Sequence, residues 1–113
     1  MIEEIVRNYL LTVLSVPVYI DVPSEPPDSY ISIERTSGGE NEHIRTATIA
    51  IQSYGATKLG AATTHENVLT KMKGLITLDA VSSCKINSEY DFTDMDTKQY
   101  RYQAVYNIVY YGG

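Results

Sequence analysis

Three stretches of the chain repeat hydrophobic residues at the period of a helix or a strand. Between residues 2 and 14 apolar side chains recur every three or four positions, which predicts an amphipathic helix that ends before Pro17. Residues 58–78 follow the same period, with Thr57 in position to cap a second helix. From 100 to 110 every second residue is Tyr, Ala or Ile, which predicts a strand with one aromatic face and one mixed, partly polar face.

Four shorter alternating runs predict further strands at 18–22, 30–35, 44–54 and 81–92. The polar, glycine-containing segment 36–43 is interpreted as a mobile loop at the tip of a long hairpin, and the Asp-rich turn at 93–97 closes a second hairpin. On the strand at 81–92, period-two alternation places five side chains on one face: Cys84, Ile86, Ser88, Tyr90 and Phe92. Cys84 is expected there as a small buried residue.

The predicted order is helix, three strands, helix, two strands. Such an α-β-β-β-α-β-β chain is expected to form an α+β fold, a mainly antiparallel sheet of about five strands with two helices packed on one face. A length of 113 residues suits a single domain spanning 1–113, and we find no internal repeat or interdomain linker.

Charge and hydropathy limit the kinds of partner that the chain is expected to bind. The formal net charge is −5, and nucleic-acid binding depends largely on phosphate neutralisation, so specific nucleic-acid binding is not expected. An adaptor that binds nucleic acid stays open as an alternative if Arg35, Arg45, Lys98 and Arg101 converge on the sheet. No apolar run approaches the ~18 residues that cross a bilayer, and no secretory leader is evident, so we expect no membrane association and a cytoplasmic or particle location.

Candidate catalytic groups are few. Glu89, Asp91, Asp94 and Asp96 form the one carboxylate cluster, but their spacing matches no calcium loop, and turn chemistry explains them better than a metal site. An enzyme or ligand-binding module with a site near Cys84 and a histidine, His43 or His65, remains the alternative. We expect no enzymatic activity, no catalytic residues, no metal and no cofactor.

Tyrosine is frequent, with ten Tyr against one Phe and no Trp. Tyrosine suits half-buried strand faces and also protein–protein contacts, so we expect it in both the core and a subunit interface. The candidate interface residues lie in the 36–43 loop, the second hairpin turn and the final strand: Glu40, Glu42, His43, Asp94, Asp96, Arg101, Gln103 and Tyr111.

Four segments carry a resemblance to a known family: 16–19 (Val-Pro-Val-Tyr), 29–33 (Ser-Tyr-Ile-Ser-Ile), 46–54 leading into an alanine-rich helix, and 100–106. With this element order, the chain resembles the small tail-terminator or tail-completion (head–tail joining) proteins of long-tailed bacteriophages and prophages. The resemblance covers nearly the whole chain and rests on patterns rather than on a single diagnostic motif. Another neck or connector protein of similar size is a related possibility.

The resemblance implies a structural protein without catalytic residues or cofactor. It implies a homo-oligomeric ring, commonly a hexamer, that caps the tail tube and joins it to the head connector. The tail-tube and head-connector proteins would be its partners, and DNA would pass through the ring. The expected location is the virion tail or neck, and the host cytoplasm during assembly.

Overall fold

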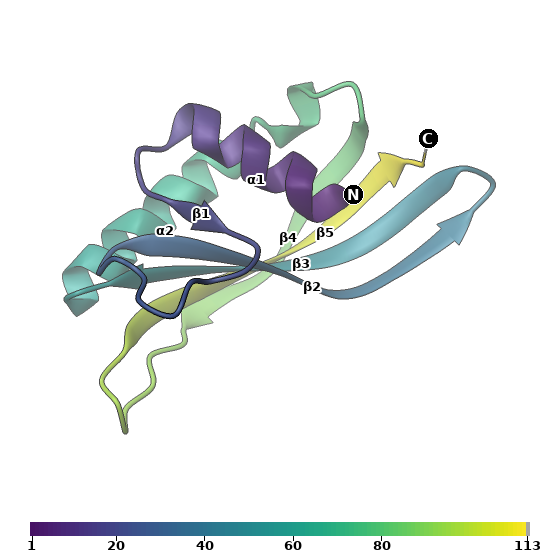
Figure 1. Cartoon of the computed structure of the whole chain (residues 1–113). Helices are drawn as coiled ribbons and strands as arrows, with labels where there is room; N and C mark the ends of the chain where they lie inside the picture. Colours follow the sequence, from purple (N-terminus) through teal and green to yellow (C-terminus); the bar gives the residue numbers. More distant parts are fainter. Residues whose placement is uncertain (113) are drawn as a thin grey trace.

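The structure is a computed structural model that describes residues 1–112 (Figure 1). Within that range the elements are α1 (Ile2–Val13), β1 (Val18–Tyr19), β2 (Tyr30–Asn41), β3 (Ile44–Gly55), α2 (Lys58–Met72), the 3₁₀ turn η1 (Leu75–Thr77), β4 (Val81–Asp91) and β5 (Tyr100–Tyr111). The predicted α+β fold and the order α-β-β-β-α-β-β are confirmed.

The five strands form one sheet in the order β1-β2-β3-β5-β4. All neighbours are antiparallel except β1 and β2, which run parallel. Both helices lie on the same side of this sheet (Figure 1). We call the side that they cover the helix face and the other side the open face.

The core lies between the helix face and the two helices. Each helix presents a buried stripe at three- and four-residue spacing, and alternate residues of the central strands complete the layer. The largest fully buried side chains include Ile2, Leu10, Ile31, Ile49, Ile51, Met72, Leu75 and Ile108. Burial of each such side chain contributes about 1.5–3 kcal/mol, so this layer holds the sheet and helices together.

The predicted loop at 36–43 is wrong in its extent. β2 continues as strand through Asn41 and pairs with β3 as far as Ile44, so the strand is longer than the predicted 30–35. The connection is a two-residue turn, Glu42 and His43, whose φ angles of 50° and 70° are both positive. Turns with positive φ at both central residues match the right-handed twist of a hairpin, so two residues are sufficient. This hairpin projects beyond the helices as an arm, defined as residues 36–48 (Figure 1).

The second helix is shorter than the predicted 58–78. α2 ends at Met72 and is followed by the turn η1, which starts after Gly74. Tyr9 of α1 explains why glycine occupies this break: its hydroxyl donates a hydrogen bond of 2.7 Å to the carbonyl of Lys71 and fills the space where a Cβ at position 74 would lie. Thr57 caps α2 as expected, accepting a 3.0 Å hydrogen bond from the backbone N–H of Gly60.

The predicted single face of β4 is wrong because the strand contains β-bulges. The register with β5 shifts between Ile86 and Ser88, so Asn87 is an extra residue and reverses the alternation. Cys84 and Ile86 lie on the helix face, whereas Ser88 and Tyr90 lie on the open face. Cys84 is half-buried rather than fully buried. The first strand is also shorter than the predicted 18–22, because only Val18–Tyr19 pair with β2.

Candidate functional site

The open face is a four-stranded surface with few charges. Strand register and the alternation of side chains assign the following residues to it: Tyr30, Ser32, Glu34 and Ser37 of β2; Ile44, Thr46, Thr48, Ala50, Gln52 and Tyr54 of β3; Arg101, Gln103, Val105, Asn107, Val109 and Tyr111 of β5; Ser83, Lys85, Ser88 and Tyr90 of β4. Among them only Glu34, Lys85 and Arg101 are charged. Depletion of charge distinguishes the centres of protein interfaces from ordinary protein surface.

A chain of hydrogen bonds crosses the open face from β2 to β4. The hydroxyl of Ser32 donates to Oε1 of Gln52 at 2.5 Å, and Nε2 of Gln52 donates to Oε1 of Gln103 at 2.6 Å. Nε2 of Gln103 then donates to the hydroxyl of Tyr90 at 2.5 Å. The exposed fractions of Ser32, Gln52 and Gln103 are 7%, 8% and 9%. We call these four side chains the amide ladder.

The amide ladder changes the expectation for Gln103. Gln103 is predicted as a candidate interface residue, but its side chain is nearly buried by its neighbours and is hydrogen-bonded at both ends. Buried amides without such partners would be costly, so the ladder makes a polar surface that is already satisfied. Its side chains hold one another in place.

Aromatic rings lie beside the amide ladder, where β2, β3 and β5 meet the second hairpin. Tyr30 and Tyr54 stack with ring centroids 4.2 Å apart and an angle of 8° between their planes. The guanidinium of Arg101 lies 4.5 Å from the ring centroid of Phe92 and 6.0 Å from that of Tyr54. Nε of Arg101 also donates a 2.8 Å hydrogen bond to the carbonyl of Phe92. Cation–π attraction holds the guanidinium of Arg101 against these rings.

At the arm the open face ends in a second polar row and an apolar pair. The hydroxyl of Ser37 donates to that of Thr48 at 3.0 Å, which in turn donates to Oδ1 of Asn107 at 3.2 Å. Beyond this row Ile44 and Tyr111 are paired in register and are both exposed. Exposed apolar side chains on a low-charge sheet favour contact with another protein.

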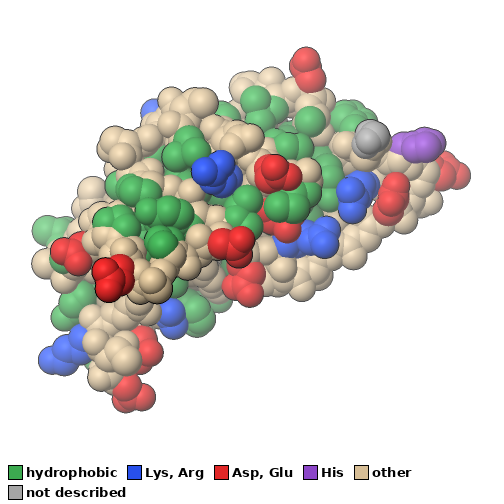
Figure 2. All heavy atoms as spheres, in the orientation of Figure 1, with side chains coloured by type: hydrophobic (Ala, Val, Ile, Leu, Met, Phe, Trp, Pro, Cys, Tyr) green, Lys and Arg blue, Asp and Glu red, His purple; other side chains and the backbone are tan. Residues whose placement is uncertain are grey.

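The eight candidate interface residues divide among three places. Arg101, Gln103 and Tyr111 lie on the open face, whereas Asp94 and Asp96 lie in the β4–β5 turn. Glu40, Glu42 and His43 lie at the tip of the arm, where Figure 2 shows acidic, basic and histidine side chains gathered together. The structure therefore brings no more than three of the eight together on one surface. The amide ladder itself was missed except for Gln103.

The turn between β4 and β5 is organised by its own carboxylates. Oδ1 of Asp94 accepts hydrogen bonds from the backbone N–H groups of Thr97 and Asp96, at 3.3 and 3.0 Å, which lowers the pKa of Asp94. At the base of the turn, Oδ1 of Asp91 accepts hydrogen bonds from the hydroxyl and the N–H of Thr93, at 2.6 and 2.9 Å. These bonds, together with Lys58, lower the pKa of Asp91 to about 2. Local turn chemistry thus accounts for both carboxylates.

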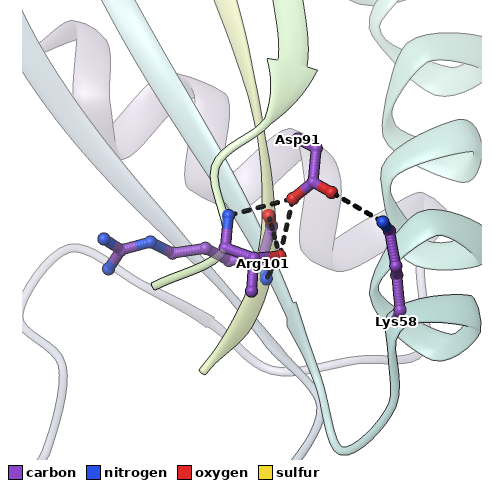
Figure 3. A network of polar contacts seen from close by, with 4 residues as sticks. Lys58, Asp91 and Arg101 are labelled. Carbon is purple, nitrogen blue, oxygen red and sulfur yellow. Dashed lines mark hydrogen bonds and ion pairs between the residues drawn. The ribbon is translucent and has the colours of Figure 1, made fainter. Parts of the chain in front are cut away.

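Lys58 connects this turn to α2. Its Nζ lies 3.2 Å from Oδ2 of Asp91, on the side of the carboxylate opposite to the Thr93 bonds (Figure 3). Arg101 emerges from the neighbouring strand and points away from Lys58 (Figure 3). The pair is a surface ion pair, which contributes little to stability.

His65 does not form the pair with Cys84 that the enzyme alternative needs. His65 is 1% exposed, its Nε2 lies 2.7 Å from Oε1 of Glu89, and its ring lies 5.1 Å from that of Tyr102. Cys84 instead lines a groove of about 410 Å³ between α2 and β4. Burial raises the pKa of the Cys84 thiol to about 11, so the thiolate needed for nucleophilic attack is scarce near neutral pH.

The four basic residues of the adaptor alternative do not converge. Arg35 lies 4.0 Å from Glu3, and Arg45 lies 4.0 Å from Glu40 and over the ring of Tyr110, on the helix face. Arg101 lies at the other end of the sheet and on its open face. Lys98 lies in the β4–β5 turn. The four residues therefore form no shared patch, and the condition for the adaptor alternative is not met.

No cluster of three or more His, Cys, Asp or Glu side chains capable of holding a metal ion occurs among residues 1–112. Over the same residues, no helix has the length and apolar character needed to cross a membrane. No family model and no curated protein matches the chain.

Proposed function

We propose that the chain is a structural subunit of the bacteriophage or prophage head–tail junction, a tail-terminator or tail-completion protein that acts by ring assembly and docking. The observation that carries the proposal is the open face, a broad sheet surface with three charged side chains and an internally satisfied amide ladder. A surface of this composition suits contact with protein better than the transformation of a small molecule.

The size of the open face fits that interpretation. The two central strands have 12 residues each, and four strands lie side by side. At a rise of about 3.4 Å per residue and a strand spacing of about 4.8 Å, the face covers on the order of 600 Å². A stable protein interface buries about 800 Å² on each partner, so this face together with part of an adjoining hairpin would be sufficient.

Two projecting hairpins support an assembly role. The arm extends past the helices, and the β4–β5 turn extends from the opposite end of the sheet (Figure 1). A cyclic ring requires two different patches on each subunit, and this molecule offers distinct features at its two ends. The structure also has the element order on which the resemblance to tail-terminator and tail-completion proteins rests.

The net charge of −5 is compatible with a DNA passage. A surface with little positive charge binds phosphate weakly, so DNA would slide through such a ring without being retained.

The enzyme and nucleic-acid adaptor alternatives have less support. Among residues 1–112 neither histidine pairs with Cys84, because His65 bonds to Glu89 and His43 lies in the turn at the tip of the arm. The basic residues are dispersed over both faces.

Deletion of the gene in a phage or inducible prophage tests this function. We expect heads and tails to accumulate separately in the lysate, as seen by electron microscopy, and the wild-type chain supplied from a plasmid to restore joined particles. A plasmid that carries the chain with Thr46→Lys and Asn107→Lys, at two exposed positions of the open face, should restore fewer particles. A plasmid with Glu25→Lys, in the exposed proline loop, is the matched control. Normal joined particles from the deletion strain would overturn the proposal.

A further inference from the structure

We infer that the subunits join edge to edge, with β2 of one copy pairing in antiparallel fashion with β4 of the next copy. The inference rests on the proposed function, because it specifies how the ring closes. It assigns the two unpaired edges of the sheet to a single heterologous contact, the type of contact that generates rings.

The outer edges of β2 and β4 are unpaired over stretches of similar length. β1 pairs with β2 only at Ile31 and Ser32, so the outer edge of β2 is open from residue 33 to residue 41. β4 is the last strand on the other side and pairs with no further strand of the described chain along 82–91, whereas the N–H of Val81 donates to the carbonyl of Leu78. Exposed edges carry unpaired N–H and C=O groups and act as templates for another strand. The free edge of β2 contains neither Pro nor Lys, two residues that commonly block such pairing.

The strand directions permit this closure. Each of the pairs β2–β3, β3–β5 and β5–β4 is antiparallel, so β2 and β4 run in opposite directions. Rotation about a ring axis that lies along the strands preserves these directions. β4 of one copy would therefore meet β2 of the next as an antiparallel pair, which is the more stable kind and needs no change in the fold.

Charge complementarity supports the contact on the open face. Lys85 of β4 and Ser37 of β2 lie in the same row across the sheet, because successive strands pair Lys85 with Asn107, Asn107 with Thr48, and Thr48 with Ser37. The next open-face residue of β2 is Glu34. If rows align between copies, Lys85 of one copy lies opposite Ser37 and diagonal to Glu34 of its neighbour. Opposite charges at diagonal positions stabilise paired strands.

On the helix face the charges are complementary in the opposite sense, with the acidic residue on β4 and the basic residue on β2. Glu89 of β4 shares a row with Ile33, and Arg35 lies on the next helix-face row of β2. In the same alignment, Glu89 of one copy is diagonal to Arg35 of its neighbour. Ile86, which shares the row of Arg35 and is 49% exposed, would be covered by the neighbour's β2. Contact between two copies of β4 would instead bring identical edges together and lose these charge pairs.

The β-bulges of β4 are consistent with selective pairing. Register shifts near Ser82 and Asn87 leave a regular run from 83 to 86 between them. Bulges and an edge lysine discourage indiscriminate strand addition. They leave a short regular segment, which contains Lys85, available to a complementary edge.

Disulfide trapping tests the contact. The variant carries Cys84→Ser to remove the native thiol, together with Ser37→Cys and Lys85→Cys, both at exposed positions. Within one chain the two sites are three strand spacings apart, about 14 Å, which exceeds the ~7 Å Cα separation that a disulfide can bridge. Any disulfide that forms on mild oxidation therefore joins two copies.

We expect a ladder of covalent dimers, trimers and higher species, up to one closed ring, on a non-reducing gel of the double-cysteine protein. Ser37→Cys alone and Lys85→Cys alone, each in the Cys84→Ser background, are the matched controls and should stay monomeric on the gel. Light scattering on the Cys84→Ser protein records oligomerisation independently, and far-UV circular dichroism verifies that each variant is folded.

The outcomes distinguish the β2–β4 contact from ring formation itself. Oligomers in solution without cross-links in the double-cysteine protein overturn the β2–β4 contact and leave the ring proposal standing. Cross-linked dimers from a single-cysteine protein show like edges pairing and also overturn it. Monomers with no cross-links at any concentration count against both the contact and ring formation by the free chain.

Should the cysteine variants fail to fold, charge exchange provides the second test. Lys85→Glu should weaken association by roughly two- to five-fold, the range of one exposed ion pair, and adding Glu34→Lys should restore it. An unchanged association constant in Lys85→Glu, or no recovery in the double variant, contradicts the contact.

Discussion

Gln52 and Gln103 face each other across the two central strands and share a 2.6 Å hydrogen bond between their amides. Both side chains are less than one-tenth exposed although no helix covers them. Their outer hydrogen bonds, to Ser32 and Tyr90, complete the amide ladder. A pre-ordered polar surface of this kind costs little conformational entropy on binding, because its side chains are already fixed.

The amide ladder should behave as a coupled unit. Gln103→Leu removes the acceptor of Gln52 Nε2 and the donor to Tyr90. Because unsatisfied buried polar groups are costly, we expect a loss of about 1–3 kcal/mol in the free energy of unfolding. The double variant Gln52→Leu/Gln103→Leu should lose less than the sum of the single losses. Urea denaturation followed by circular dichroism measures all three, with Asn41→Leu on the exposed arm as control. Strictly additive losses would contradict the coupling.

Any residue larger than glycine at position 74 should destabilise the protein as long as Tyr9 keeps its hydroxyl. A Cβ at position 74 would occupy the space of the Tyr9 hydroxyl, so Gly74→Ala should lower the free energy of unfolding by about 1–3 kcal/mol, as overpacking does. In a Tyr9→Phe background, which lacks the hydroxyl, the same substitution should cost clearly less. Thermal unfolding of the four proteins completes this comparison. An equal cost in both backgrounds would show that the contact is unimportant.

Asp91 should titrate well below an ordinary aspartate. Its pKa of about 2, against 3.8 for the free side chain, means that the native state holds the ionised form more strongly than the unfolded state does. Its contribution to stability is therefore fully present above pH 3.8 and is lost as the pH falls through 2. Carboxyl-carbon NMR should give this midpoint. Thr93→Val should raise the pKa more than Lys58→Met does, because the hydroxyl of Thr93 is the larger cause. The reverse order would contradict this assignment.

Cys84 should react slowly while the protein is folded. A pKa near 11 instead of 9.0 reduces the thiolate fraction at pH 8 by about 100-fold, so alkylation by iodoacetamide should slow by at least that factor relative to the urea-unfolded chain. Cys84→Ser is the blank for the mass-spectrometric readout. Equal rates for folded and unfolded protein would mean that the thiol is not buried against α2. They would also revive a nucleophilic role.

Periodicity predicted the fold well because burial follows it. The alternation through Tyr106, Ile108 and Tyr110 identified the helix face of β5, and the spacing from Ile2 to Leu10 identified the buried stripe of α1. Bulges were not predictable in this way. Nothing in the residues around Asn87 distinguishes an inserted strand residue from a paired one, so every later position of β4 was assigned to the wrong face.

The open face could not be predicted from the sequence of any single strand. The amide ladder requires the register between Gln52 and Gln103, which are about 50 positions apart in the chain and are paired only through the sheet. The loop at 36–43 is predicted too long because Gly38 and Gly39 are of the residue type usually found at positive φ, whereas the turn is confined to Glu42 and His43. In the structure these glycines lie within β2, where a Cβ at position 38 would press against the carbonyl of Thr46.

The proposed location of the protein in a particle can be measured directly. Quantitative mass spectrometry of purified, joined phage particles, combined with cryo-electron microscopy of their necks, should find this chain in a small fixed copy number as a single ring between tail tube and head connector. Complete particles that lack the chain, with a fully formed head–tail joint, would contradict the account.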